Sequence, residues 1–530
     1  MSLYDDASLI AYPSGYKESK IYAQKPVNGT GDLTFTRASS ATRVNAEGLI
    51  ETATIIEDVY ASNFSSGADG WISNDVSFGT VTGSIDSIGG VNDTLRFSCL
   101  LTVGSARQFK KLASKTIGKN YIITYSYYLP STNTDLVAIY SDETNTRNFV
   151  QDTWTTVTEQ FTAASTNVVI PVGDADNYLS PSTVGDVAYI KNVVIKEVIT
   201  SNVPRIDYSN GCGSLLLEPQ RTNSQIYSQD FTNATYIKDA GITINSTNNT
   251  SPSGALDATK ISVTNSGRIY SNTASNTWCT SVFLKAGTFA YFELAGKKID
   301  LNLGTMVGGT IEDYGNGWYR VTGIATTIRS FQIVAYPNSS YAVHTTSGDY
   351  FIWGVQSELS ATYPTSYIPT LGTAVTRIKD SSSTTGLSSV INSTEGVLYA
   401  EIAALADDLS FRIISISDGT TNNNVGFGYR NSSNVIYTFV QAVINSSTAV
   451  TVSDITAFNK VAIKYKSGDF AMWINGVEVY TSATAFTLTG LNQVSFDNGG
   501  AAANFFGNVQ NLMVFDSALT DTELATLTTI

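Results

Sequence analysis

The sequence predicts an almost entirely β protein built from several sandwich modules. Apolar residues make up 42% of its 530 residues and charged residues only 14%. Tyrosine (29), phenylalanine (23) and glycine (41) are abundant, and aromatic and β-branched side chains suit strands while glycine, asparagine and serine suit turns. The length exceeds a single hydrophobic core and indicates roughly three or four units. An internal duplication is the third observation.

Two blocks of sequence recur at one spacing. Trp154 and Trp318 lie 164 positions apart in similar blocks, and the earlier blocks 93–98 and 257–262 keep the same spacing. A register shared over about sixty residues indicates two copies of one β-module, and many short strands favour a jelly roll over a barrel. Recurrence in both copies favours a core position for each tryptophan.

The N-terminal segment is the least self-sufficient part of the chain. It contains too few large apolar residues for an independent core, so it should lean on another part of the chain or on a neighbouring subunit, and the sequence favours neither. We predict five segments: a base and attachment segment (1–51), a jelly roll (52–201), a continuation of the base (202–223), a second jelly roll (224–378) and a third β-sandwich (379–530).

The third sandwich has its own local signals. Residues 379–386 read as a linker or a first turn. Asn475 and Gly476 form a two-residue hairpin turn of the type that needs positive φ. Residues 521–524 offer the start of a helix of one or two turns.

Composition disfavours several functions. The net charge is −14, from 31 basic and 45 acidic residues, without a basic run, so no binding to nucleic acid is expected. No signal peptide and no membrane span is predicted. Three dispersed cysteines and a single histidine, His344, support no disulfide framework, zinc site or histidine-dependent triad. We therefore expect no enzymatic activity and no cofactor.

Aromatic residues are the natural contacts for sugars, because a pyranose face stacks on Trp or Tyr while amides and carboxylates bond its hydroxyls. Trp71 lies in a loop-like stretch, which leaves exposure of its ring open. Trp473 lies on the strand face opposite Met472. The candidates for glycan contact are Trp71, Trp473, Tyr429 and Tyr437.

Acidic residues suggest two weaker alternatives. Asp497 and Asn498 offer oxygen ligands to Ca²⁺, but such a run is more often a turn, and no metal is predicted. A polysaccharide depolymerase needs only two carboxylates. Asp407 and Asp408 are adjacent and point apart in an extended strand, so hydrolysis ranks below binding.

Several stretches resemble bacteriophage virion proteins. Residues 34–45 (TFTRASSATRVN) resemble an opening motif of tail or head fibre proteins, and 203–208 with 215–223 (LLLEPQRTN) resemble the motif that usually follows it directly. Their wide separation implies that the first jelly roll is inserted into a continuous base, so that 1–51 pairs with 202–223. Residues 350–370 resemble the end of carbohydrate-binding-type jelly rolls.

The C-terminal sandwich is similar to laminin-G and concanavalin A-like lectin domains, through residues 472–476 and 506–524. Together the resemblances imply a tail or head appendage that is assembled in the host cytoplasm and acts as part of the virion outside the cell. Its sandwiches would bind host surface polysaccharide, and a purely structural decoration or spacer is the alternative.

The resemblance also implies where the protein attaches to the particle. The candidates for contact with other virion proteins are Arg37, Arg43, Arg205, Glu218 and Arg221. A homo-oligomer is expected, with a trimer favoured. Because no coiled-coil heptad is present, the β-modules or the base would hold it together.

Overall fold

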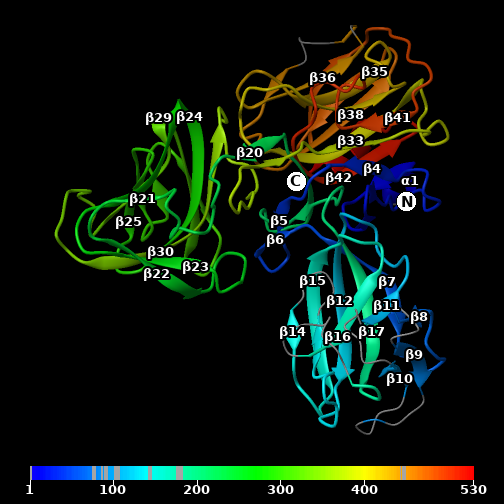
Figure 1. Cartoon of the computed structure of the whole chain (residues 1–530). Helices are drawn as coiled ribbons and strands as arrows, with labels where there is room; N and C mark the ends of the chain where they lie inside the picture. Colours follow the sequence, from blue (N-terminus) through cyan, green and yellow to red (C-terminus); the bar gives the residue numbers. More distant parts are fainter. Residues whose placement is uncertain are drawn as a thin grey trace. The chain divides into compact units, whose positions relative to one another are not determined.

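The computed structural model describes residues 3–73, 79–84, 88, 93–100, 108–140, 146–174, 183–441, 443–444 and 449–530. The chain forms two compact units, one of Thr54–Ile199 and one of Met1–Ala53 with Thr200–Ile530 (Figure 1). The first of these corresponds to the jelly roll expected at 52–201. The predicted all-β fold class is confirmed. No helix in the described ranges is long and apolar enough to cross a membrane.

The C-terminal sandwich consists of two facing sheets. The first has the order β18-β19-β42-β33-β38-β39-β40, with β1 paired to β42. Its strands are β1 (Leu9–Ala11), β18 (Ile206–Asp207), β19 (Ser214–Leu217), β33 (Glu395–Ala404), β38 (Asn459–Lys466), β39 (Phe470–Ile474), β40 (Val477–Ser482) and β42 (Gly507–Phe515).

The second sheet has the order β2-β3-β4-β32-β41-β34-β35-β36-β37. Its strands are β2 (Tyr16–Lys17), β3 (Lys20–Ile21), β4 (Leu33–Thr36), β32 (Ser381–Thr384), β34 (Arg412–Ser417), β35 (Asn424–Tyr429), β36 (Val435–Val440), β37 (Val450–Thr451) and β41 (Gln493–Ser495). One buried cluster of aliphatic and aromatic residues from both sheets fills the space between them.

The base is part of this sandwich and not a separate element. Leu9 pairs with Val514, and Leu215 pairs with Val509, so both base segments extend the sheet that contains β42. The stretch expected to be a linker contains β32, which lies between β4 and β41 in the other sheet. The weak apolar content of residues 1–51 is therefore compensated within the chain, because their few large side chains enter a core that other segments supply.

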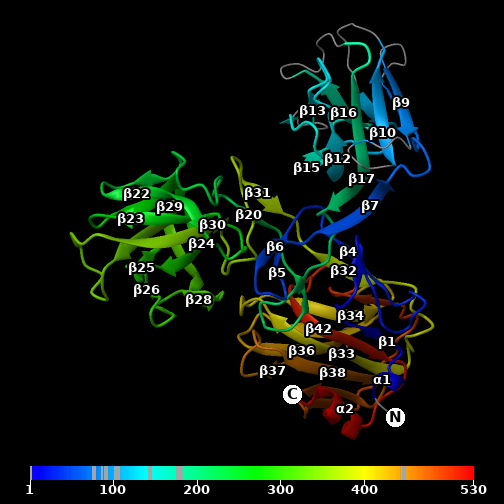
Figure 2. The same ribbon diagram turned by 90° about the horizontal axis from the view of Figure 1, so that it is seen from below.

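Local predictions in the sandwich are confirmed. Asn475 and Gly476 have φ of 51° and 84° in the turn between β39 and β40. The terminal helix α2 spans Asp521–Thr528, with a capping box between Thr520 and Glu523. A second short helix, α1 (Leu3–Asp6), was not predicted. Figure 2 shows both helices on the same side of the sandwich.

The second jelly roll is one continuous sheet folded around its core. Its strands are β20 (Arg221–Asn223), β21 (Ile237–Lys238), β22 (Ile242–Asn249), β23 (Ala258–Val263), β24 (Arg268–Ala286), β25 (Tyr291–Leu294), β26 (Lys297–Asp300), β27 (Thr305–Met306), β28 (Thr310–Asp313), β29 (Trp318–Tyr336), β30 (Gly348–Leu359) and β31 (Val375–Arg377). The long strands β24 and β29 pair throughout, with bulges near Asn272 that let them bend.

The inserted jelly roll has two separate sheets, β15-β12-β17-β10-β9 with β7 on β17, and β14-β13-β16-β11-β8. The strands of the first are β7 (Ile55–Ser62), β9 (Gly79–Ser84), β10 (Thr94–Cys99), β12 (Asn120–Tyr128), β15 (Thr155–Thr162) and β17 (Val187–Ile199). Those of the second are β8 (Trp71–Ile72), β11 (Gln108–Lys111), β13 (Ala138–Tyr140), β14 (Arg147–Asn148) and β16 (Val168–Gly173). Alternate residues of both enclose one core.

A small hairpin connects the base to the second jelly roll. It is formed by β5 (Thr42–Val44) and β6 (Ile50–Thr52). Val44 and Ile50 pack against Trp318 and Trp353 of the second jelly roll, and the Ile50 amide donates a hydrogen bond to the carbonyl of Pro252. This contact covers one outer face of that jelly roll.

Candidate functional site

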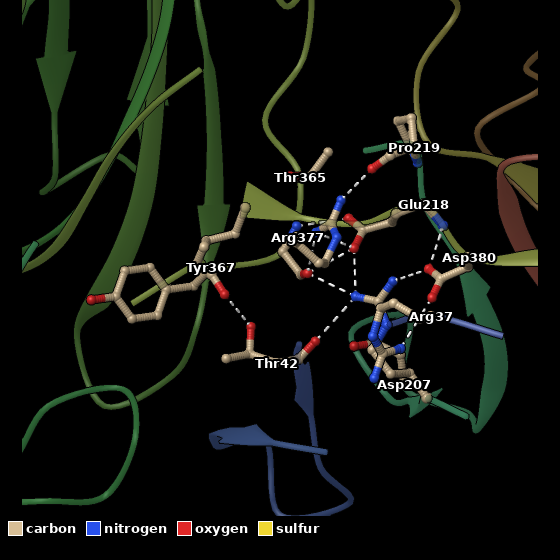
Figure 3. A network of polar contacts seen from close by, with 12 residues as sticks. Arg37, Thr42, Asp207, Glu218, Pro219, Thr365, Tyr367, Arg377 and Asp380 are labelled. Atoms are coloured by element: carbon tan, nitrogen blue, oxygen red, sulfur yellow. Dashed lines mark hydrogen bonds and ion pairs between the residues drawn. The ribbon is translucent and has the colours of Figure 1, made fainter. Parts of the chain in front are cut away.

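Three arginines and two carboxylates form a buried ion-pair cluster where the base, the second jelly roll and the C-terminal sandwich meet (Figure 3). Arg205 lies between Glu218, at 2.5 Å, and Asp380. Arg37 pairs with Asp380 at 3.0 Å, and Arg377 pairs with Glu218 at 2.7 Å. None of these side chains is more than 3% exposed.

Hydrogen bonds complete the cluster. The Ser366 amide and hydroxyl both donate to Glu218, each at 2.7 Å. Burial alone would raise the pKa of Glu218, but Arg377, Arg205 and Ser366 lower it to about 2. Burial and the neighbouring Arg205 lower the pKa of Arg37 to about 10. A charge buried at this depth persists only with such partners, so the cluster fixes the geometry of the junction.

Beside the cluster lies a pocket of about 770 Å³, here called the junction pocket. Base, second jelly roll and C-terminal sandwich all contribute to its wall. The residues on which its chemistry depends are Arg43, Glu47, Asp207, Tyr208, Glu218, Glu312, Asp313, Tyr314, Asn316, Arg320, Ser366, Tyr367 and Thr456. This volume lies within the range of small-ligand sites, roughly 300–1,000 Å³.

A tight turn presents one wall of the junction pocket. The Asp313 carboxylate accepts the Gly315 amide at 2.8 Å, and Asn316 has φ of 52° between two glycines that also have positive φ. The turn places Tyr314 against the Phe283 ring, with centroids 5.0 Å apart. Burial raises the pKa of Tyr314, so its hydroxyl stays protonated and can donate a hydrogen bond.

Arg320 lies on the floor of the same pocket and is 5% exposed. Its Nη2 donates to the Ser281 hydroxyl and to the Thr365 carbonyl at 3.0 and 2.6 Å. Two of the pocket carboxylates are also engaged. Asp207 accepts the Val44 amide at 2.8 Å, and Glu218 belongs to the ion-pair cluster. The side chains of Glu47, Glu312 and Asp313 belong to exposed residues at the rim.

The attachment candidates divide into two groups. Arg37, Arg205 and Glu218 are buried, and their charges are satisfied by other segments of the chain. Arg43 is half-buried and pairs with Glu51 at 2.9 Å, while Arg221 lies over the Tyr363 ring at 5.6 Å. The first three therefore hold the chain together instead of presenting a surface to another protein.

The four aromatic candidates are all buried. Trp71 and Tyr429 are each 2% exposed, and Tyr437 and Trp473 each 8%. Exposure of Trp71, which the sequence left open, does not occur, because its ring packs on Phe64 and its Nε1 donates to the Tyr60 hydroxyl at 3.0 Å. None of the four presents a free ring face for stacking.

Trp473 lies on the outer face of its sheet, as predicted, but that face is covered. Ala7, which follows α1, and Leu524 of α2 both belong to the buried cluster that contains Trp473. The expected core position of Trp154 is also wrong, since this residue is half-buried on an outer sheet face. Its counterpart Trp318 is 2% exposed.

The oxygens of Asp497 and Asn498 close a turn. Asp497 accepts the Ser495 hydroxyl and the Gly499 amide at 2.9 and 2.7 Å. Asn498 accepts the amides of Gly500 and Ala502. Within the described ranges, no group of three or more His, Cys, Asp or Glu residues is arranged to hold a metal ion.

Arg43 and Glu218 of the junction pocket were predicted as attachment residues, but the sequence did not predict the pocket as a glycan site. Tyr208, Tyr314 and Tyr367 each lie within or beside a block that the sequence had marked, namely the base motif, the repeated tryptophan block and the end of the second jelly roll. That proximity was the available signal. Their convergence depends on contacts such as the 2.5 Å hydrogen bond from the Thr42 hydroxyl to the Tyr367 carbonyl.

Comparison with known proteins adds distant structural neighbours. The chain matches no described family, and no curated protein is similar to it in sequence. It is similar to the CBM40 of a Ruminococcus gnavus sialidase, with 20% identity over 26% of this chain and 85% of that one, at a TM-score of 0.20. The CBM22 tandem domain of Paenibacillus barcinonensis Xyn10C shares 11% identity over 57% and 98%, at 0.29.

A Trypanosoma rangeli sialidase is similar over 93% of this chain and 98% of its own length, with 11% identity and a TM-score of 0.23. At TM-scores this far below 0.5, no inference about function is taken from these neighbours. The β-sandwich architecture stands on the strand order and the buried cores described above.

Proposed function

We propose that the protein is an attachment protein of a bacteriophage particle, a tail or head fibre or adhesin, that binds host surface polysaccharide through its β-sandwich modules. The junction pocket carries the glycan part of this proposal. Tyr208 and Tyr314, which are both half-buried, supply apolar faces with hydroxyl tips, and the rim supplies amide and carboxylate oxygens. This combination suits a polyhydroxylated ring, which has both an apolar face and many hydrogen-bonding groups.

The ion-pair cluster supports the pocket as a preformed site. Glu218 and Ser366 belong to both, so the wall on that side is fixed by buried charges and hydrogen bonds. A rigid site loses less conformational entropy when a ligand binds. Single sugar sites bind weakly, and several copies in one particle would raise the avidity by roughly 10²–10⁴ when geometry permits.

The two stretches that resemble virion motifs support the proposed location. Arg37, from residues 34–45, and Arg205 with Glu218, from residues 203–223, converge on the same cluster, which supports one continuous base. Binding to other virion proteins and assembly into a homotrimer are also proposed. A density map of an intact particle that contains the protein would check both. A map that places no copy on the particle would reject the virion role.

We further propose that the protein binds polysaccharide without cleaving it. Asp207 and Glu218, the most buried carboxylates of the pocket, are occupied by structural hydrogen bonds and ion pairs, which supports this view. Incubation with the bound polysaccharide should release no reducing ends. Release of reducing ends that is abolished by Glu312→Gln would favour a depolymerase instead.

Glycan binding by the full chain tests the site. Tyr314→Phe removes a single hydroxyl, and Thr456→Trp fills the pocket from an exposed position; both should weaken binding, the first by about tenfold. Tyr319→Phe is the matched control, because Tyr319 lies five residues further along the chain, at the start of β29, and packs against the core. Glycan-array binding followed by calorimetry gives the dissociation constants. Equal binding by all three variants would reject the pocket.

A further inference from the structure

The two jelly rolls present the same sheet face in different surroundings. Trp154 and Trp318 are equivalent, because each indole Nε1 donates to a carbonyl between two equivalent strands, that of Ile88 between β9 and β10 at 3.2 Å and that of Thr250 between β22 and β23 at 3.0 Å. The preceding equivalent residues, Asp152 and Asn316, have φ of 53° and 52°. The copies can therefore be compared residue by residue.

Strand register extends this equivalence across the face. Ser126 pairs with Thr156 and Lys191 in the inserted jelly roll. At the equivalent position in the second, Phe283 pairs with Arg320 and Trp353. The basic residues of the equivalent strands β10 and β23 also match. Arg96 lies over the Tyr189 ring at 6.0 Å, and Lys260 lies over the Phe351 ring at 5.9 Å.

In the second jelly roll this face is an internal interface. Phe283, Trp318 and Trp353 form a buried cluster with Val44 and Ile50 of the β5-β6 hairpin. The hairpin packs on these large apolar residues, which accounts for their presence on the outer face. In this jelly roll the face therefore binds another segment of the chain.

In the inserted jelly roll the positions equivalent to Phe283, Arg320 and Trp353 carry the smaller polar side chains of Ser126, Thr156 and Lys191. Ser126 and Thr156 share a hydrogen bond of 2.8 Å. Thr156 is exposed and lies two residues after Trp154. Tyr128 and Trp154 are both half-buried, with ring centroids 5.6 Å apart. An aromatic pair bordered by hydroxyls fits a sugar better than an apolar hairpin.

Lys191 gives the face its charge preference. Its ammonium lies 4.1 Å from the centroid of the Trp154 ring, and within the described part of the chain it makes no ion pair. Lys196, on the same strand, is paired with Asp58 at 3.2 Å. An anionic group on a ligand would supply the counter-charge that Lys191 lacks, by a charge-assisted hydrogen bond.

We infer that the outer face of the inserted jelly roll, formed by Tyr128, Trp154, Thr156 and Lys191, binds a saccharide that carries a carboxylate. The aromatic pair contacts the sugar ring, Lys191 pairs with the carboxylate, and Thr156 bonds a ring hydroxyl. This inference rests on the proposed glycan recognition but assigns a second site, separate from the junction pocket and different in charge preference.

The test uses the full chain and four carboxylated polysaccharides: polygalacturonate, alginate, hyaluronan and polysialic acid, each beside its carboxyl-reduced form. At least one acidic polymer should bind, and its reduced form should bind at least about tenfold more weakly. Lys191→Gln should cause a loss of similar size. Thr156→Arg, which introduces the side chain found at Arg320 and removes the hydroxyl bonded to Ser126, should block the position of the sugar ring on this face.

Lys196→Gln is the matched control, since it removes an equal charge from the same strand, and Tyr314→Phe controls for the junction pocket. Lys196→Gln should leave binding to the acidic polymer unchanged, whereas Tyr314→Phe measures what the junction pocket contributes to it. Binding lost with Tyr314→Phe but kept with Lys191→Gln and Thr156→Arg would overturn this inference while supporting the junction pocket. The inference is also overturned if no acidic polymer binds, or if reduced polymers bind equally well.

Discussion

Trp154 and Trp318 occupy equivalent positions of a duplicated module, yet the first lies beside a lysine on a half-exposed face and the second lies beneath a hairpin at 2% exposure. The difference arises from what each copy packs against. The same sequence block therefore packs against the β5-β6 hairpin in the second jelly roll and lies on a half-exposed face in the inserted jelly roll.

Replacement of the two tryptophans should separate these roles. Trp318→Ala removes a buried ring between the hairpin and the second jelly roll, and we expect a loss of about 3–5 kcal/mol in the free energy of unfolding. Trp154→Ala should cost about 1 kcal/mol, because its ring is half-exposed. Denaturant unfolding measures both. Equal losses would contradict the assignment of an open face to Trp154.

Local features of the fold were predictable because they depend on neighbouring residues. The turn at Asn475 and Gly476 follows from the positive φ that only a few residues tolerate, and the terminal helix follows from its cap. The pairing of Leu9 with Val514 carries no local signal. For that reason the base was predicted as a separate segment when it is part of the C-terminal sandwich.

The aromatic candidates failed for a related reason. Alternation along a strand placed Trp473 on the outer face correctly, but it cannot show whether another segment covers that face. Leu524 and Ala7, from opposite ends of the chain, cover it. The resemblance to virion motifs located Arg37, Arg205 and Glu218, whereas their convergence on Asp380 required the fold.

The turn at Asp497 offers a test of metal dependence. Since its carboxylate accepts the Ser495 hydroxyl and the Gly499 amide, the turn closes with protein groups alone. EDTA should leave the melting temperature unchanged, while Asp497→Ala should lower stability by about 1 kcal/mol through the lost hydrogen bonds. A melting temperature that falls with EDTA and recovers with Ca²⁺ would contradict this.

Two buried glutamates of the same region should respond differently to neutralisation. Glu218→Gln leaves Arg205 and Arg377 without their shared counter-charge, and we expect a loss of about 3–5 kcal/mol. Glu358 accepts the amide and hydroxyl of Thr365 and forms no ion pair with any described residue, so Glu358→Gln should cost far less. Thermal and denaturant unfolding at neutral pH compare the two. Equal losses would show that the ion-pair cluster contributes nothing specific.

The same pair predicts opposite changes in acid stability. The pKa of Glu218 is lowered to about 2 from an ordinary value of about 4.3, so its stabilisation is complete above the ordinary value and is lost as the pH falls towards 2. Burial raises the pKa of Glu358, so its ionised form is a penalty above the ordinary value, and protonation relieves that penalty as the pH falls.

Stability measured between pH 7 and pH 3 should therefore fall less steeply in Glu218→Gln than in the wild type, and more steeply in Glu358→Gln. Urea unfolding monitored by tryptophan fluorescence gives the slopes. Exposed Glu57 is a suitable control position, since Glu57→Gln should reproduce the wild-type slope. Parallel slopes in all four proteins would mean that neither carboxyl is coupled to folding through its buried partners.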